Sequence, residues 1–196
     1  MWYMYHMVQL GMVTVQPKDR LLDAAVEHAL QRGIVDLSLR EIAAAIGTSH
    51  RMLIYHFGSR EGLLVAVVRE VERREHRMIA WESFTAADAR REWDRLIDPS
   101  LRAQERLFFE IYVHALLGRP GTDGFLEDAL EGWISPMVDS LTRSGVERDE
   151  ARAVARLGVA VTRGLLLALL ASGDSAGVTR AYELFASLLE HASTGT

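Results

Sequence analysis

The stretch from Ser38 to Phe57, SLREIAAAIGTSHRMLIYHF, predicts two short helices joined by a tight turn. Ser38 and Glu41 have the spacing of a capping box, in which a serine hydroxyl and a glutamate carboxylate satisfy free backbone N–H groups at a helix start. Gly47 stands where the first helix would end, because glycine readily takes the positive φ of a helix C-terminus. Ser49 can cap the next helix. The stretch therefore predicts a helix, a turn and a second helix.

The second of these helices has few apolar side chains. Its expected buried face consists of Leu53 and Phe57, which are four positions apart. Its other faces carry His50, Arg51, Met52, Tyr55 and His56. Two helices of about two turns each bury too little surface to fold alone, so neighbouring segments must cover them.

Helices on both sides can provide that cover. Residues 18–32 have apolar side chains at helical spacing, and Gly33 is a suitable end for this helix. Ser59 can cap a long helix that begins with Leu63 and Leu64. The result is a three-helix unit followed by a connecting helix, an arrangement that lays its second short helix in the major groove of DNA.

The span from about Asp19 to Val71 resembles the DNA-binding domain of the TetR family of transcriptional regulators. The residues that carry the resemblance are Gly33, Ser38, Leu39, Arg40, Glu41, Ile42, Ala43, Gly47, Thr48, Ser49, Leu53, Phe57, Ser59, Arg60, Glu61 and Leu63. One position departs from the family pattern: the tyrosine usual after the leucine of the reading helix is Ile54 here, although Tyr55 and His56 follow. The phosphate contact usual at that position therefore lacks its donor.

The resemblance implies a set of DNA contacts in this span. The set is Ser38, Arg40, Thr48, Ser49, His50, Arg51, Met52, Tyr55, His56 and Arg60. The hydroxyl groups, the tips of Tyr55 and His56, and the charge of Arg60 suit phosphate oxygens, which fix register but do not report sequence. His50, Arg51 and Met52 lie on the first turn of the reading helix, where Arg51 can bridge O6 and N7 of a guanine for about 1–3 kcal/mol of discrimination.

The charge of the chain is compatible with this interpretation because it is unevenly distributed. The net charge is −5, which alone disfavours a general nucleic-acid binder. Residues 17–63, however, hold six Lys/Arg and six Asp/Glu, so the negative surplus lies later in the chain.

With 196 residues and 49% apolar composition the chain can bury a core. The absence of cysteine fits a reducing cytosol, so we expect a cytoplasmic protein.

Membrane proteins and enzymes are disfavoured. The apolar stretch from Val154 to Ala171 is interrupted by Arg156 and Arg163, and its longest uninterrupted part is too short to cross a bilayer, so we interpret it as a buried helix. The histidines lack Glu-x-x-His and His-x-x-x-His spacing, and no glycine-rich phosphate loop follows a strand. We therefore predict no catalytic residue, no metal site, no cofactor and no membrane contact.

The sequence predicts an all-α fold of about nine helices, with a helix-turn-helix domain at residues 17–63 and a larger helical domain at residues 64–196. Residues 1–16 are interpreted as an N-terminal extension, with Met12 as a natural start, or alternatively as an arm that packs on a neighbour. The mixed-charge run from Glu72 to His76 is expected on a solvated face. Thr85 and Asp88 are expected in a loop.

By resemblance, the middle helices line a ligand cavity. The candidates are Trp81, Phe108, Tyr112, Trp133, Met137 and Arg163, each of which also suits an ordinary core position. A guanidinium on an apolar helix needs an acceptor or water. Glu110 or Glu131 could satisfy Arg163 internally, and if neither does, an acidic ligand is favoured.

By resemblance, the last two helices form a four-helix dimer interface, and the alternative is that they only close the monomer core. The expected interface residues are Val161, Leu165, Ala168, Tyr182, Phe185 and Leu189.

The predicted function is a DNA-binding transcriptional regulator, a homodimeric repressor released from a palindromic double-stranded DNA operator by an unknown small-molecule effector. The alternative is a helical small-ligand-binding protein that does not bind DNA, supported only by Ile54 and the negative net charge.

Overall fold

The computed structural model describes residues 16–83 and 85–194, and the regular structure of this part is entirely helical. In chain order the elements are α2 (Pro17–Arg32), α3 (Leu39–Ala45), α4 (His50–Phe57), α5 (Arg60–Met78), η2 (Trp81–Ser83), α6 (Ala86–Leu96), η3 (Pro99–Leu101), α7 (Arg102–Leu116), α8 (Phe125–Arg143), α9 (Arg148–Ser172) and α10 (Ser175–Thr194). These nine α-helices confirm the predicted all-α class for the described residues. The expected extension at residues 1–16 lies outside them, apart from Gln16.

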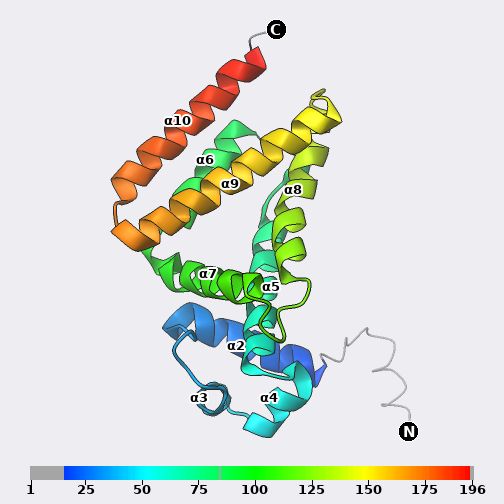
Figure 1. Ribbon diagram of the computed structural model, residues 1–196, viewed down its shortest axis with the longest axis vertical. Coiled ribbons are helices and arrows are strands. Elements are labelled where there is room, and N and C mark those ends of the chain that lie inside the picture. The colour runs from blue at the N-terminus through cyan, green and yellow to red at the C-terminus, as the bar shows by residue number, and fades with distance from the viewer. Residues whose placement is uncertain (1–15, 84, 195–196) are drawn as a thin grey trace, which may run out of the picture.

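Two groups of helices are joined by α5 (Figure 1). The helices α2, α3 and α4 gather at one end of the molecule, and α6, α8, α9 and α10 form the other end. α5 runs from the first group into the second, and α7 lies between them. The expected boundary between residues 63 and 64 therefore falls inside a continuous helix.

The caps predicted from the sequence are present at α3 and α4. The Ser38 hydroxyl accepts a hydrogen bond from the Glu41 N–H at 3.3 Å, and the Glu41 carboxylate accepts one from the Ser38 N–H at 2.7 Å. Gly47 has φ +71°, as the turn requires. The Ser49 hydroxyl accepts from the Met52 N–H at 3.2 Å. Local sequence thus fixes both helix starts and the turn between them.

A single core holds α4 in place and continues into α7. Leu53 is fully buried and is the only buried residue of α4, whereas Phe57 is half-buried and packs at the edge of the cluster. The same cluster includes Leu63 and Leu64 of α5 and Ile111 of α7. The position of α4 therefore depends mainly on one leucine, which packs into a core shared by both ends of the molecule.

Two local expectations are wrong. Thr85 and Asp88 form the capping box of α6 rather than a loop, because the Asp88 carboxylate accepts from the Thr85 N–H at 2.8 Å and the Thr85 hydroxyl accepts from the Asp88 N–H at 3.3 Å. The helix α9 is not buried all round, since Leu157 and Leu167 on it are exposed. Within the described part of the chain, α9 is the one helix long and apolar enough to span a membrane, a test that core helices of globular proteins also pass.

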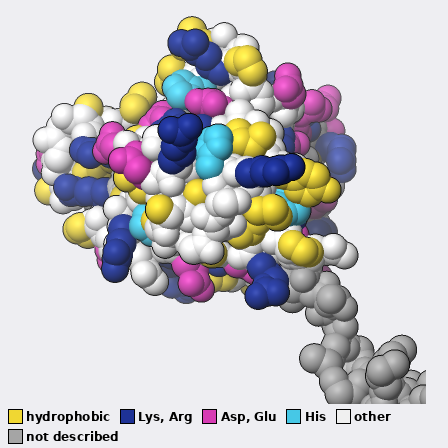
Figure 2. Space-filling model, turned by 90° about the horizontal axis from the view of Figure 1, so that it is seen from below, with side chains coloured by type: hydrophobic (Ala, Val, Ile, Leu, Met, Phe, Trp, Pro, Cys, Tyr) yellow, Lys and Arg dark blue, Asp and Glu magenta, His cyan; other side chains and the backbone are white. Residues whose placement is uncertain are grey.

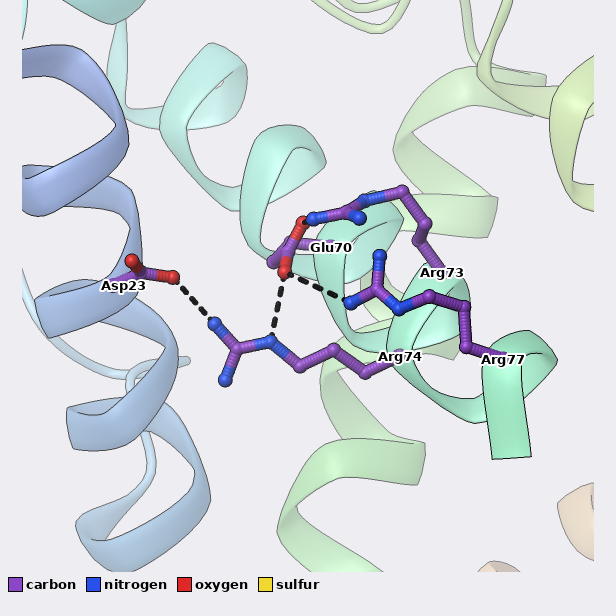
Figure 3. A network of polar contacts seen from close by, with 5 residues as sticks. All are labelled: Asp23, Glu70, Arg73, Arg74 and Arg77. Carbon is purple, nitrogen blue, oxygen red and sulfur yellow. Dashed lines mark hydrogen bonds and ion pairs between the residues drawn. The ribbon is translucent and has the colours of Figure 1, made fainter. Parts of the chain in front are cut away.

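Arg74 ties α5 to α2 and is itself held by a buried carboxylate of α5 (Figure 3). Glu70 of α5 is buried and accepts from the guanidinium groups of Arg73 and Arg74, and Arg74 also donates to Asp23 of α2 at 2.5 Å. Burial disfavours the ionised form of Glu70, but the hydrogen bonds from Arg74 and Arg73 outweigh burial and lower its pKa. Arg77 lies 3.9 Å from the same carboxylate.

Replacing Glu70 with glutamine is expected to lower the free energy of unfolding by about 1–3 kcal/mol, because the guanidinium groups lose their buried anion. The lowered pKa means that the contribution of Glu70 is present above its unfolded pKa and is lost as pH falls through the folded one. Urea unfolding at neutral pH and at about pH 4 measures the difference in unfolding free energy between the unchanged chain and Glu70→Gln. This difference should be smaller at about pH 4. Arg77→Gln is the control and should cost less than about 1 kcal/mol. Equal losses of unfolding free energy in Glu70→Gln and Arg77→Gln would contradict the role of Glu70 as the buried anion of this cluster.

Candidate nucleic-acid interface and ligand cavity

The helix α4 presents a polar and amphipathic face to solvent. His50, Arg51 and Met52 on its first turn are exposed, and Tyr55 is 78% exposed, because the inward position is taken by Leu53. Figure 2 views the molecule from the end that carries α3 and α4, and Lys, Arg and His side chains are distributed over this surface between hydrophobic ones. Such a face can contact base edges and phosphates together.

The remaining expected DNA contacts differ in accessibility. Ser38, Arg40 and Ser49 are exposed, and the two serine oxygens accept the capping N–H bonds while their own O–H groups can still donate. Thr48 is half-buried. His56 is also half-buried, and its Nε2 is sealed from solvent and meets no hydrogen-bond partner in the described part of the chain, so its tip lies inside the domain rather than at the surface.

The structure also differs from expectation at Arg60. Its guanidinium donates to the backbone carbonyls of Leu37, at 2.9 Å, and Val35, and it lies 3.6 Å from Glu110 of α7. These acceptors hold the loop before α3 against α5. Arg60 is therefore a structural residue that joins three segments.

A cavity of about 190 Å³ lies among α5, α6, α7, α8, α9 and α10. Its walls are mainly apolar and aromatic, and they include five of the six residues expected from the sequence: Trp81, Phe108, Trp133, Met137 and Arg163. Tyr112 lies instead beside a second hollow, between α7, α8 and α9. A mostly apolar cavity with a few polar groups is the usual form of a small-molecule site.

Sequence reasoning missed the acidic residues of the cavity. Glu72 and Glu75 were expected on a solvated face, but both line the cavity, and Glu75 is buried together with Glu105 of α7. Burial raises the pKa of Glu72 to about 7 and that of Glu105 to about 8. One feature of the sequence could have indicated that these glutamates point inward: Glu72 and Glu75 lie on the same face of α5 as Val68 and Val71.

The partner of Arg163 is neither of the expected glutamates. Glu110 pairs with Arg60, and Glu131 accepts from Arg152 at 2.6 Å. Arg163 donates to the Ala129 carbonyl and lies 3.9 Å from Glu72. Its guanidinium also stands over the rings of Phe108, at 4.8 Å, and Tyr112, at 5.6 Å. Arg163 is thus held inside the protein by contacts other than the predicted carboxylates, although its Nη1 is buried and meets no acceptor among the described residues.

The expected interface helices expose a different face from the predicted one. Tyr182 is buried, its ring stacks on Trp93 at 4.4 Å, and its hydroxyl donates to the Ala89 carbonyl at 3.2 Å. Leu165 and Phe185 pack against the same cluster. Val161 is half-buried and Ala168 is exposed, while the Leu189 side chain lies outside the described residues. The exposed apolar face of α9 and α10 instead carries Leu157, Leu167, Leu184 and Leu188.

Comparison with known proteins agrees with this architecture. Residues 21–67, which run from α2 into α5, match the family described as bacterial regulatory proteins, tetR family. The HTH-type transcriptional regulator BetI of Rhizobium meliloti (strain 1021) is 33% identical over 101 residues. That match covers 50% of this chain and 48% of BetI, so the similarity spans about half the length of the curated relative.

Solved structures resemble nearly the whole chain. Salmonella enterica GusR is 25% identical, with a TM-score of 0.62 over 91% of this chain and 93% of GusR. The multidrug binding protein EbrR complexed with ethidium is 24% identical, with a TM-score of 0.62 over 85% of this chain and 96% of EbrR. The likeness to EbrR establishes a shared fold. Residues 21–67 therefore carry the match to the tetR family of bacterial regulatory proteins, and the chain shares its fold with these solved structures.

Proposed function

We propose that the chain is a DNA-binding transcriptional regulator, acting in the cytoplasm, in which residues 17–63 read DNA and residues 64–196 bind an effector and dimerise. The observation that carries the proposal is the exposed face of α4, with His50, Arg51 and Tyr55 turned to solvent from a domain that matches the family. An isolated helix of this length would not be stable, so the packed core around Leu53 is what holds this exposed face in place.

The continuity of α5 supports a coupling between the two functions. Its first turns carry Leu63 and Leu64 in the core that holds α4, and its later turns carry Glu72 and Glu75 in the cavity wall. A ligand that moves the cavity end of this helix would also move the reading end. Linkage then requires the effector to bind the DNA-free form more tightly, by the factor by which it weakens DNA binding.

We further propose a homodimer in which α9 and α10 pair with their copies through the exposed leucine face. In such a dimer the two α4 helices would enter successive major grooves about 34–36 Å apart, so the operator would be palindromic. Release of DNA by the effector would make the chain a repressor. EbrR, a structural neighbour, binds ethidium, which supports a small-molecule site in a chain of this fold.

The test of DNA binding is a gel-shift selection from random duplexes, followed by titration of the selected sequence with salt. We expect a palindromic sequence whose association constant falls by about 10³–10⁵ between about 50 and 200 mM salt, as six to ten phosphate contacts would produce. Binding without sequence preference, or no binding at all, would contradict the proposal. Ligand binding in a chain that ignores DNA would favour the small-ligand carrier instead.

Replacing Arg51 by alanine is expected to relax selectivity at one base pair in each half-site, at a cost of about 1–3 kcal/mol for each contact. Arg51 is exposed on the first turn of α4, where its fork can reach a guanine edge. Sequencing of bound duplexes from a selection measures the change. The control is Arg91→Ala on α6, an exposed arginine in a local ion pair with Asp88. Unchanged base preference in the Arg51 variant would remove Arg51 from the reading set.

A further inference from the structure

The cavity holds more negative than positive charge. Four of its described lining residues are carboxylates, namely Glu72, Glu75, Glu92 and Glu105, whereas Arg163 is the single guanidinium among them. Arg95, outside the lining, lies 3.1 Å from Glu75 and donates to Glu92. Two guanidinium groups therefore face four carboxylates, which leaves a negative surplus in an apolar and aromatic space when all are ionised.

Glu105 is the cavity carboxylate that makes no direct hydrogen bond or ion pair with a described residue, although the charges of Arg95 and Arg163 act on it from a distance. Its neighbours are satisfied: Glu75 accepts from Gln104 at 2.6 Å, and Glu72 accepts from the Trp133 indole at 3.2 Å. Glu105 is only 8% exposed and has no hydrogen bond or ion pair with any residue that the structure describes. A buried polar group of this kind is costly unless something completes it, and a carboxylate is completed by a cation.

Arg163 does not offer a matching site for an acid. Its guanidinium already donates to the Ala129 carbonyl, lies beside Glu72 and covers two aromatic rings. Its Nη1 has no acceptor but is sealed from solvent, so a ligand in the cavity would not reach it without rearrangement. The acidic ligand, expected only if neither Glu110 nor Glu131 paired with Arg163, therefore meets no accessible guanidinium among the described residues of the lining.

The remaining walls suit an aromatic cation. Trp81, Trp93 and Trp133 line the cavity, and indole faces attract cations as well as apolar groups. We propose that this cavity binds an organic cation carrying an aromatic ring, with the Glu105 carboxylate as its counter-ion; as an identification of the effector, this inference rests on the proposed function. The volume of about 190 Å³ favours a compact cation over a large polycyclic one.

Cation binding is coupled to loss of a proton from Glu105. Burial raises the pKa of Glu105 to about 8, so its carboxyl is mostly protonated at neutral pH in the empty cavity. A cation favours the ionised form, and the proton is released to water. The charged groups that face Glu105 are Glu72 and Glu75 from α5, Arg95 from α6 and Arg163 from α9. Affinity should therefore rise with pH, by up to about tenfold per unit below the pKa of Glu105.

Three compounds of similar size separate charge from shape. Trimethylphenylammonium is the cation, tert-butylbenzene is its neutral isostere, and benzenesulfonate is an anion of comparable size. Binding to the purified chain without DNA is followed by tryptophan fluorescence, since three tryptophans line the cavity, and by thermal shift. We expect the cation to bind at least about tenfold more tightly than the neutral isostere, and the anion most weakly.

Two variants complete the experiment. Glu105→Gln should weaken trimethylphenylammonium binding by about tenfold or more, reduce its pH dependence to the part contributed by Glu72, and leave tert-butylbenzene binding unchanged. Glu70→Gln, which removes a buried glutamate outside the cavity, should leave all three affinities unchanged. Equal affinities for cation and isostere, preference for the anion, absence of cation binding, or an unaffected Glu105→Gln variant would each overturn the proposal.

The outcome is independent of DNA binding. Cation binding is measured on the DNA-free chain, so its failure leaves the gel-shift result intact. Conversely, a chain that binds the cation through Glu105 but selects no operator would refute the regulator and keep the ligand class. If both hold, adding trimethylphenylammonium to the operator complex should release DNA from the unchanged chain and much less from Glu105→Gln.

Discussion

A Leu184→Glu variant is expected to sediment as a monomer at concentrations at which we expect the unchanged chain to form the proposed dimer. Leu184 is 63% exposed on the outer face of α10, near Leu188 on the same face, and Leu157 and Leu167 provide the matching face of α9. In a two-fold interface each substitution occurs twice, so two carboxylates would be buried without partners. The cost is about 3 kcal/mol or more, which weakens dimerisation by at least about 100-fold.

Leu116→Glu is the matched control for this experiment. Leu116 is also 63% exposed but lies at the end of α7, away from the proposed interface. Analytical ultracentrifugation over a concentration series, with circular dichroism to verify folding, should separate the two variants. A Leu184→Glu chain that remains a dimer would exclude this face. Dissociation of both variants would show that added charge alone disrupts assembly.

Leu184→Glu is also expected to weaken binding to the operator. A monomer can occupy only one half-site, and it must supply all of its affinity through a single α4. The operator complex of Leu184→Glu should therefore weaken far more than the local change would suggest, while the preference for bases within one half-site stays the same. Altered base preference would instead indicate damage to the reading domain.

The parts of the structure predicted from sequence are those fixed by short-range chemistry. Ser38 with Glu41, and Ser49 with Met52, are capping pairs whose members lie three residues apart. The turn after α3 requires a positive φ, which Gly47 adopts. Leu53 was identifiable because a mostly polar short helix leaves few choices for its buried position. These local features together specify the helix-turn-helix without reference to tertiary contacts.

The errors arose where a side chain is satisfied from far along the chain. Arg60 looked like a phosphate ligand, but its acceptors are carbonyls more than twenty residues away. Glu75 looked solvated in a mixed-charge run, yet Arg95 and Gln104 meet it inside the protein. The helix α10 has two apolar faces. The stacking of Tyr182 on Trp93 identifies the face that packs inward. Helical periodicity identifies such faces without assigning them to core or interface.

Raising the pH from about 5 to about 8 is expected to destabilise the unchanged chain, relative to Glu105→Gln, by about 3 kcal/mol. The pKa of Glu105 is raised from 4.5 to about 8 by burial, with the charges of Glu75 and Glu72 acting in the same direction and Arg95 and Arg163 opposing. Between these two values the folded state keeps a proton that the unfolded state has released. The unfolded state binds fewer protons, so stability falls as pH rises.

Comparison of the two chains isolates this contribution. Burial lowers the pKa of His76, which makes stability rise with pH in the lower part of the same range, but this effect is present in both chains and cancels in the difference. Glu72, with a pKa of about 7, also remains in both. Guanidinium unfolding at several pH values gives the two curves, which should nearly meet near pH 5 and separate above it. Parallel curves would mean that Glu105 has an ionic partner in solution, and the cavity would then lack the unpaired carboxylate to which we assign cation binding.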